Sequence, residues 1–317
     1  MLFMLRFDLR NPAFAGVAMS ERVQAAIEMC GWADQRGGIY ASLSEHHGVE
    51  DGYLPSPLTM AAAIAARTST MRIGINALVA PFYDPIRLAE DAAVVDLISG
   101  GRLDLTIAGG YVADEFAMFD VPMAERPARV REAVATLRAA WTGEPFEYRG
   151  RTVRVRPTPA QPGGPKIILG GTSEAAARRA ARIADGFIPS ETTCWEFYRD
   201  ECLQLGKPDP GPGMTIDAAV VVLAEDPEAA WPELGPYFLH EVNTYGALQA
   251  GAGVKAVYEP VTGIDELRAG SQYRILTPDE YAAEIRELGF AGLHPMAGGI
   301  PPKLAWEHLH LFAETFL

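Results

Sequence analysis

The chain has 317 residues, enough for two average domains, although α/β barrels of this length commonly form one. Its 41 Asp and Glu residues outnumber its 27 Lys and Arg residues, and the net charge of −14 argues against binding to nucleic acids or to anionic membrane surfaces. No apolar run approaches the roughly 20 residues that span a bilayer.

The N-terminal segment MLFMLRFDL is apolar, but Arg6 and Asp8 interrupt it before it reaches the length of a signal peptide. We expect it to form the first strand. The three cysteines, Cys30, Cys194 and Cys202, have no metal-ligand spacing and require no oxidising compartment. A cytoplasmic protein is therefore expected.

Short apolar runs alternate with amphipathic segments along the whole chain, which predicts alternating strands and helices. The expected strands are 2–9, 39–43, 72–79, 103–108, 166–169, 186–189, 215–224 and 292–296. The expected helices begin at Ser20, Pro57, Pro85, Arg126, Ser173, Pro227, Pro278 and Pro301. Eight such pairs indicate an α/β protein with a (β/α)8 TIM barrel, formed by residues 1–317 as one domain.

Two insertions interrupt this rhythm. Residues 142–164 contain FEYRGRTVRV, which predicts a hairpin with its turn at Arg149-Gly150. Residues 240–275 are rich in glycine without a clear period, and they predict a lid-like loop that could shield a reactive site from water. His240 and Tyr245 in this loop are candidate substrate contacts.

The motif Glu45-His46-His47 directly follows the second expected strand. The carboxyl ends of barrel strands carry the active site, and a histidine there can exchange a proton near neutral pH. Position alone leaves open whether these histidines are catalytic or are surface and supporting residues. No third His or Cys has the spacing of a metal site, so no metal is expected.

Small residues occupy the ends of the next two strands. The third strand contains Gly74-Ile75-Asn76-Ala77-Leu78, and the fourth ends in Gly109-Gly110-Tyr111. Small residues allow a flat ligand to approach the main chain closely, although an ordinary barrel strand remains the alternative. Tyr111 is a further candidate substrate contact.

The segment PKIILGGTSEAAARRAARIADGF runs from a strand through a glycine turn into an alanine-rich helix. Free N–H groups at a helix N-terminus bind anions, and phosphate is the expected ligand of this turn. Simple helix capping by Thr or Ser is the alternative, but capping does not require two glycines. The residues of the turn are Gly170, Gly171, Thr172 and Ser173.

These motifs, with P.RLAED and D..S.GR between them, occur in one order over residues 42–119. That order resembles the bacterial luciferase-like flavin monooxygenases, and the resemblance continues through TPDEYAAEIRELGFAGLHPMAGGIPP near the C-terminus. It implies a TIM barrel with insertions. The D..S.GR residues Asp96, Ser99, Gly101 and Arg102 are expected to stabilise the opposite end of the barrel from the active site.

The family includes monooxygenases that use reduced FMN and O2 to oxygenate a small organic substrate through a C4a-hydroperoxyflavin. It also includes oxidoreductases that pass hydride to or from F420, and non-catalytic flavin-binding subunits that lack the active-site histidine. Because His46 is retained, the resemblance implies a monooxygenase, with an F420-dependent enzyme as the alternative. No G-x-G-x-x-G follows a strand, so a separate flavin reductase or free diffusion is expected to supply reduced FMN.

The resemblance also implies roles for individual residues. His46 is expected near the reactive edge of the flavin as the catalytic residue, and a non-proline cis peptide between Asn76 and Ala77 is expected to support the isoalloxazine ring. The turn 170–173 is expected to bind the cofactor phosphate. Luciferase has a phosphate-binding arginine where this chain has Gly109, which leaves open how the phosphate is held.

The helices that begin at Pro57 and Pro85 carry apolar residues on more than one face, although a barrel helix needs a single apolar stripe. Relatives bury this surplus between two subunits, which predicts a homodimer. Coverage by one of the insertions is the alternative. The apolar residues are Leu58, Ala61, Ala62, Ile64 and Ala65 on the first helix and Leu88, Ala92, Val94, Val95, Leu97 and Ile98 on the second.

Overall fold

The computed structural model describes residues 1–213, 219–250 and 258–317. The chain folds into two compact units, each formed by segments that are not contiguous in the sequence. Unit 1 comprises Met1–Pro55, Arg67–Arg72 and Asp217–Leu317, and unit 2 comprises Ser56–Ala66 and Ile73–Ile216. The expectation of a single domain remains a prediction.

Unit 1 contains two groups of parallel strands. Strand β1 (Phe3–Phe7) pairs with β2 (Gly38–Leu43) on one side and with β11 (Ala291–Leu293) on the other. Strand β9 (Val220–Leu223) pairs in parallel with β10 (Tyr273–Leu276). The helical elements are η1 (Ala13–Ala15), α1 (Met19–Asp34), α8 (Pro227–Gln249), α9 (Ile264–Ala269), α10 (Pro278–Leu288), η4 (Ala297–Gly299) and α11 (Pro302–Phe316).

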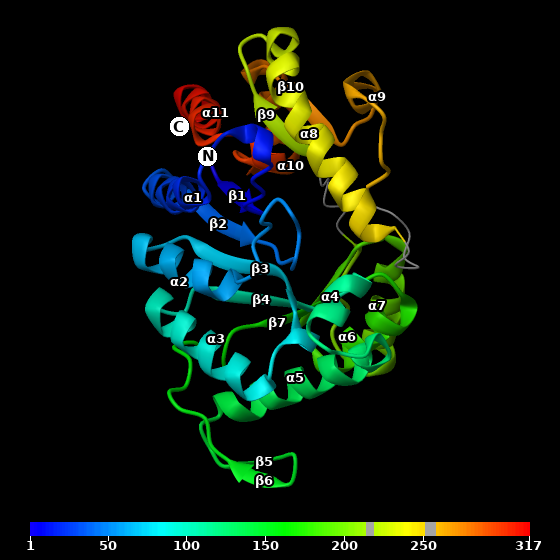
Figure 1. Cartoon of the computed structure of the whole chain (residues 1–317). Helices are drawn as coiled ribbons and strands as arrows, with labels where there is room; N and C mark the ends of the chain where they lie inside the picture. Colours follow the sequence, from blue (N-terminus) through cyan, green and yellow to red (C-terminus); the bar gives the residue numbers. More distant parts are fainter. Residues whose placement is uncertain (214–218, 251–257) are drawn as a thin grey trace. The chain divides into compact units, whose positions relative to one another are not determined.

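The two faces of β1 differ in character because successive side chains of a strand point to opposite sides. Phe3 is fully buried and packs against Trp32 of α1 and Phe312 of α11, with ring centroids 6.3 Å and 5.2 Å away. Helices α1 and α11 lie side by side on this face (Figure 1). Met4 and Arg6 are half-buried and belong to the opposite face.

Unit 2 is built on a four-stranded parallel sheet, in the order β3 (Arg72–Val79), β4 (Leu103–Ala108), β7 (Ile167–Gly171) and β8 (Gly186–Pro189). The helical elements are α2 (Pro57–Arg67), η2 (Ala80–Phe82), α3 (Pro85–Ser99), α4 (Ala113–Met118), η3 (Met123–Glu125), α5 (Arg126–Trp141), α6 (Glu174–Ile183) and α7 (Thr193–Gln204). Helices therefore follow the strands along this unit, as the sequence pattern predicts.

Several helix starts have the side-chain caps that the sequence indicates. Asp84 accepts hydrogen bonds from the first free N–H groups of α3, and Pro85 occupies the first helical position. Thr277 and Glu280 form a reciprocal capping box at the start of α10. These caps set where each helix begins after its strand.

The hairpin predicted within 142–164 is confirmed. Strands β5 (Phe146–Tyr148) and β6 (Arg151–Val153) are antiparallel and are joined at Arg149-Gly150 (Figure 1). Both turn residues have positive φ, 48° and 74°, as a tight two-residue hairpin turn requires.

The lid-like loop predicted over 240–275 is wrong for most of its described residues. Residues 240–249 are the last part of the 23-residue helix α8, and 273–276 form strand β10. The helix buries Trp231, Leu234, Phe238 and Tyr245 at spacings of three, four and seven residues, which is the pattern of one helical face. Residues 251–257 lie outside the described residues, as do 215–218 of the expected seventh strand.

Residues of the D..S.GR signature organise the segment between α3 and β4. The buried Asp96 carboxylate accepts hydrogen bonds from the main-chain N–H and the side-chain amide of Gln161, at 2.9 Å and 2.8 Å. Ser99 Oγ accepts from the Arg102 N–H at 3.0 Å, and the Arg102 guanidinium donates to the carbonyl of Ala65. All these contacts join elements of the fold, which supports the structural role expected from the sequence.

Candidate functional site

The carboxyl end of β3 in unit 2 has an irregular main chain. The peptide bond between Asn76 and Ala77 is cis, so this expectation is confirmed. The pairing of β3 with β4 shifts its register between Asn76 and Leu78. Asn76 Oδ1 accepts a hydrogen bond of 2.7 Å from Thr106 Oγ1 of β4, which holds the Asn76 side chain toward the neighbouring strand.

Glycine at position 170 leaves space beside this pair. A Cβ atom at Gly170 would lie 3.7 Å from Cγ2 of Thr106 and 3.8 Å from Cβ of Ala108. The structure thus places Asn76, Thr106 and Gly170 together at the carboxyl ends of β3, β4 and β7, where the main chain is open to close approach.

The turn from β7 into α6 combines a tight packing contact with a helix cap. A Cβ atom at Gly171 would lie only 2.5 Å from Cβ of Ala176, so glycine is needed for the helix to start this close to the strand. Ser173 is the N-cap, and its Oγ accepts from the N–H of Ala176 at 3.3 Å. Thr172 and Ser173 are exposed. Ser173 therefore caps α6, and the binding of phosphate by the turn 170–173 remains a prediction.

The glycines after β4 lie against the start of α5. Gly110 has φ +73°, and a Cβ atom there would lie 2.7 Å from Val79. Arg126 Nη1 donates to the carbonyl of Gly110 at 2.9 Å, and Cβ of Arg126 would lie 3.8 Å from a Cβ at Gly109. The half-buried Arg126 therefore brings a positive charge beside the position where luciferase has its arginine. Only the tertiary fold shows this, because 17 residues separate Gly109 from Arg126.

In unit 1, the two adjacent histidines have different surroundings. His46 is 7% exposed, and its ring meets Tyr53 edge to face at 4.9 Å and Tyr245 at 6.1 Å. His47 instead shares a hydrogen bond of 2.8 Å with the buried carboxylate of Glu45. His46 thus belongs to an aromatic cluster, whereas His47 is held by an acidic neighbour.

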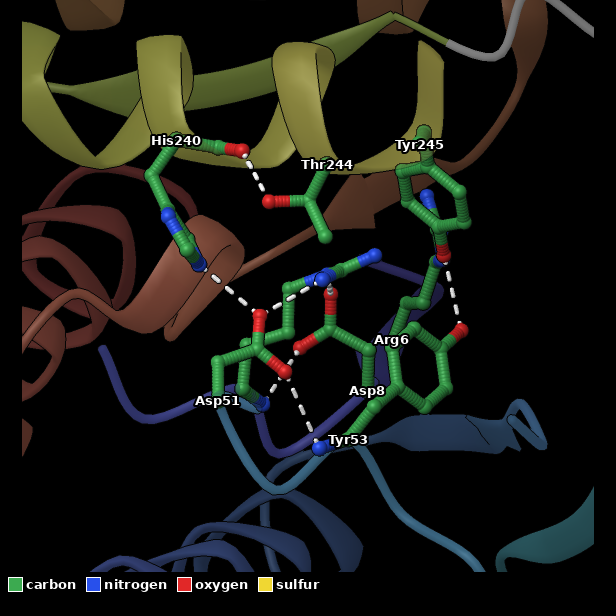
Figure 2. Close-up of polar contacts among 8 residues, drawn as sticks. Arg6, Asp8, Asp51, Tyr53, His240, Thr244 and Tyr245 are labelled. Carbon is green, nitrogen blue, oxygen red and sulfur yellow. Dashed lines mark hydrogen bonds and ion pairs between the residues drawn. The ribbon is translucent and has the colours of Figure 1, made fainter. Parts of the chain in front are cut away.

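A buried ion network lies next to this cluster (Figure 2). The Arg10 side chain is fully buried and donates to Asp51 Oδ2 at 2.6 Å, with Asp8 Oδ2 at 3.4 Å from its Nε. Its guanidinium lies over the rings of Tyr53 and Tyr245. Burial alone would raise the pKa of Asp51, but the hydrogen bond from His240 and the charge of Arg10 hold that pKa below its ordinary value.

His240 and Tyr245 come from α8 and point toward residues of the N-terminal part of unit 1 (Figure 2). His240 Nε2 lies 2.8 Å from Asp51 Oδ2, and the side chain is 24% exposed. Tyr245 shares a hydrogen bond of 2.7 Å with the hydroxyl of Tyr53 and accepts one of 3.1 Å from Arg6. Tyr245 is thus brought to His46, whereas His240 binds the ion network. Their role as substrate contacts remains a prediction, as does that of Tyr111.

Glu241, also on α8, is the least expected member of this region. Its side chain is 1% exposed, and burial raises its pKa to about 7, an effect that Asp8 adds to and that Arg6 and Arg10 oppose. The carboxyl group is therefore only partly ionised at neutral pH. Glu241 stands among the polar residues His240, Asn243 and Thr244 in the sequence, so nothing there signals that its side chain is buried with Phe238 and Tyr245.

The residues that the structure describes contain no group of three or more His, Cys, Asp or Glu side chains suited to a metal ion. Nor does any helix in the described part of the chain have the length and apolar character needed to cross a membrane.

Comparisons with known proteins place this geometry in a family. Residues 5–288 match the model of the luciferase-like monooxygenases. The chain is 39% identical over 127 residues to the oxygenase component of a flavin-dependent trigonelline monooxygenase from Acinetobacter baylyi, covering 39% of this chain and 35% of that protein. It is 32% identical over 182 residues to an F420-dependent glucose-6-phosphate dehydrogenase from Nocardia farcinica, covering 54% of each. The matches thus span about a third to a half of these relatives.

Solved structures match over nearly the full length. Monooxygenase RslO1 from Streptomyces bottropensis is 26% identical, with a TM-score of 0.74, covering 100% of this chain and 98% of that one. The oxygenating constituent of 3,6-diketocamphane monooxygenase from Pseudomonas putida, solved with FMN, shares the fold at 19% identity and a TM-score of 0.71, covering 99% and 97%. The (β/α)8 fold class is thereby confirmed, and the chain belongs to the luciferase-like monooxygenase family.

Proposed function

We propose that the protein is a flavin-dependent monooxygenase that binds reduced FMN and uses O2 to oxygenate a small organic substrate. The observation that carries the proposal is the grouping of Asn76, Thr106 and Gly170 at the carboxyl ends of β3, β4 and β7, where small residues leave the main chain open. Main chain that is exposed between small residues suits a flat isoalloxazine ring. The similarity to the trigonelline monooxygenase component and to monooxygenase RslO1 supports oxygenation.

Residues of unit 2 fit the proposed cofactor. Asn76 and Ala77 would support the ring, and Gly109 and Gly110 would allow it to approach the main chain. The turn Gly170–Ser173, of which Thr172 and Ser173 are exposed, would bind the phosphate through free N–H groups at the start of α6. When bound, reduced FMN supplies the electrons that activate O2. A separate flavin reductase, or reduced FMN free in solution, would deliver it.

Two residue sets would complete the reaction. His46 would hold or transfer a proton, since its imidazole can donate or accept a hydrogen bond and its ring lies against those of Tyr53 and Tyr245. The substrate would contact Tyr111, His240 and Tyr245.

An F420-dependent oxidoreductase is the second candidate function. The match to the F420-dependent dehydrogenase, which extends over 54% of the chain, favours it. A non-catalytic flavin-binding subunit is the third candidate, and the retention of His46 argues against it.

Anaerobic calorimetric titration with reduced FMN and with F420 tests the cofactor. We expect the protein to bind reduced FMN, and we expect Gly171→Val to weaken that binding by about 10-fold or more. The valine Cβ would collide with Ala176, only 2.5 Å away, and would displace the anion-binding turn. Gly263→Val is the matched control, because a Cβ there meets no atom within 4 Å. Tight binding of F420 without FMN would replace the proposal with the second candidate.

We also propose a homodimer that forms through α3. Four of the five apolar residues named on α2 are buried within the chain, so the surplus expected there is smaller than the sequence suggested. On α3, however, Val94, Leu97 and Ile98 are 43–46% exposed and form an apolar patch. A second copy of the chain would cover this patch on both subunits.

The dimer predicts that Leu97→Glu halves the mass measured by light scattering at micromolar concentration, because the new charge would be buried in the interface. Ala62→Glu on α2 is expected to act in the same direction. Leu203→Glu is the control, since Leu203 is a similarly exposed leucine, at 49%, on α7. A monomeric mass for the unmodified protein would refute the dimer.

A further inference from the structure

Arg6 has different side-chain partners from Arg10, the next arginine along the chain. It lies on the face of β1 opposite to α1 and α11 and is half-buried. Its Nη2 donates to the Tyr245 hydroxyl at 3.1 Å, and its positive charge opposes the rise that burial causes in the pKa of Tyr258. No described residue forms an ion pair with Arg6, whereas Arg10 has Asp51 and Asp8 as partners.

The ionisable side chains around Arg6, Glu241 and His294, do not fully neutralise its positive charge. Glu241 is only partly ionised at neutral pH, because burial raises its pKa to about 7. His294 follows β11 beside Arg6, and burial, with the charges of Arg6 and His308, lowers its pKa to about 3. His294 is therefore neutral, and its buried Nδ1 has no hydrogen-bond partner among the described residues. A guanidinium in such surroundings favours an anionic ligand.

Aromatic rings border the guanidinium. Tyr245 and Tyr258 are stacked, with ring centroids 4.4 Å apart and an interplanar angle of 14°. The Tyr53 hydroxyl bonds to that of Tyr245, and His46 contacts the rings of Tyr53 and Tyr245. Figure 2 shows Arg6, Tyr53 and Tyr245 converging. Flat aromatic rings beside one guanidinium group are suited to binding a planar organic acid.

We propose that the substrate carries one carboxylate group, and that Arg6 binds this group as a substrate-specificity residue near His46. The proposal rests on the proposed function, in which the surroundings of His46 receive the substrate. A single positive charge that the partly ionised Glu241 offsets only in part matches a monoanion better than a phosphate dianion, because neutral His294 adds no second charge. The remaining guanidinium N–H groups of Arg6 supply the donors for the carboxylate oxygens.

The test compares benzoate, its neutral analogue benzamide, and phenyl phosphate as calorimetric probes of the unmodified protein and of Arg6→Met and Arg6→Lys. We expect benzoate to bind the unmodified protein about 10-fold to 100-fold more tightly than benzamide, the range of a charge-assisted hydrogen bond. Arg6→Met should abolish that preference and Arg6→Lys should keep part of it. Equal affinities for benzoate and benzamide, no binding of either, or a preference for phenyl phosphate would overturn the proposal.

Two further readouts separate a substrate role from other roles. Arg6→Met should keep a melting temperature close to that of the unmodified protein, because no described carboxylate forms an ion pair with Arg6 and the nearby Glu241, whose pKa is about 7, can take up a proton when that charge is removed; a large fall would make Arg6 a structural residue and overturn the proposal. Arg6→Met should also bind reduced FMN normally; loss of that binding would assign Arg6 to the cofactor and likewise overturn it. If benzoate binds through Arg6 but neither FMN nor F420 binds, the anion subsite stands and the proposed function fails.

Discussion

Replacing His46 with alanine is expected to lower the rate of oxygen consumption with reduced FMN and substrate by ~10²-fold or more, the usual contribution of a positioned acid–base group. The fold should persist. His46 meets Tyr53 and Tyr245 through ring-edge contacts, and these two tyrosines keep their mutual hydrogen bond of 2.7 Å without it. The melting temperature of His46→Ala should therefore stay close to that of the unmodified protein.

The adjacent histidine provides a matched control. His47→Ala removes the hydrogen bond to Glu45, whose side chain is fully buried, so we expect a lower melting temperature and a much smaller effect on turnover. The two variants should thus show opposite signatures. If His46→Ala unfolds, or if it turns over at the normal rate once folded, His46 is a core histidine and the catalytic assignment is wrong.

The second large effect is expected at Arg10. Arg10→Met should reduce the free energy of unfolding by about 3–5 kcal/mol at pH 7, the usual range when one member of a buried ion pair is removed. Asp51 and Asp8 would remain as buried carboxylates without the guanidinium that now lies 2.6 Å and 3.4 Å from them. Urea denaturation of the variant and the unmodified protein measures the difference.

The loss should also depend on pH in a defined direction. Burial raises the pKa of Asp51, but His240 and Arg10 together hold it below the ordinary value in the folded protein. The stabilisation from this group is therefore fully present above the ordinary Asp pKa of about 4 and is lost as pH falls through the lower folded pKa. The destabilisation of Arg10→Met should shrink over that range.

Two companion variants make this prediction sharper. The double variant Arg10→Met/Asp51→Asn should recover part of the lost stability, because it removes one of the stranded charges. Arg199→Met, which breaks the exposed pair with Asp209, should change stability much less, since solvent screens that pair. An Arg10→Met variant as stable as Arg199→Met would show that the buried network does not stabilise the fold.

Features that depend on residues close together in the chain were predictable from the amino-acid sequence. The period of apolar residues predicted the parallel strands and their helices, and the hairpin at Arg149-Gly150 followed from its turn residues. The ordered motifs identified the family and the cis peptide at Asn76-Ala77, because such motifs mark a main-chain geometry that the family shares. Ser173 was recognisable as a cap from its place before an alanine-rich helix.

Features that depend on residues far apart in the chain became visible only in the folded protein. The helix that begins at Pro227 was expected, but residues 240–249 at its end were taken for a loop because the glycines from Gly246 onward are poor helix formers, and the packing of Val242 and Tyr245 outweighs that weakness. Strand β10 is only four residues long and is defined by pairing with β9. Arg6 looked like an interruption of an apolar segment. Only the fold brings Tyr245 to it across 239 residues and places the partly ionised Glu241 near its charge without an ion pair among the described residues.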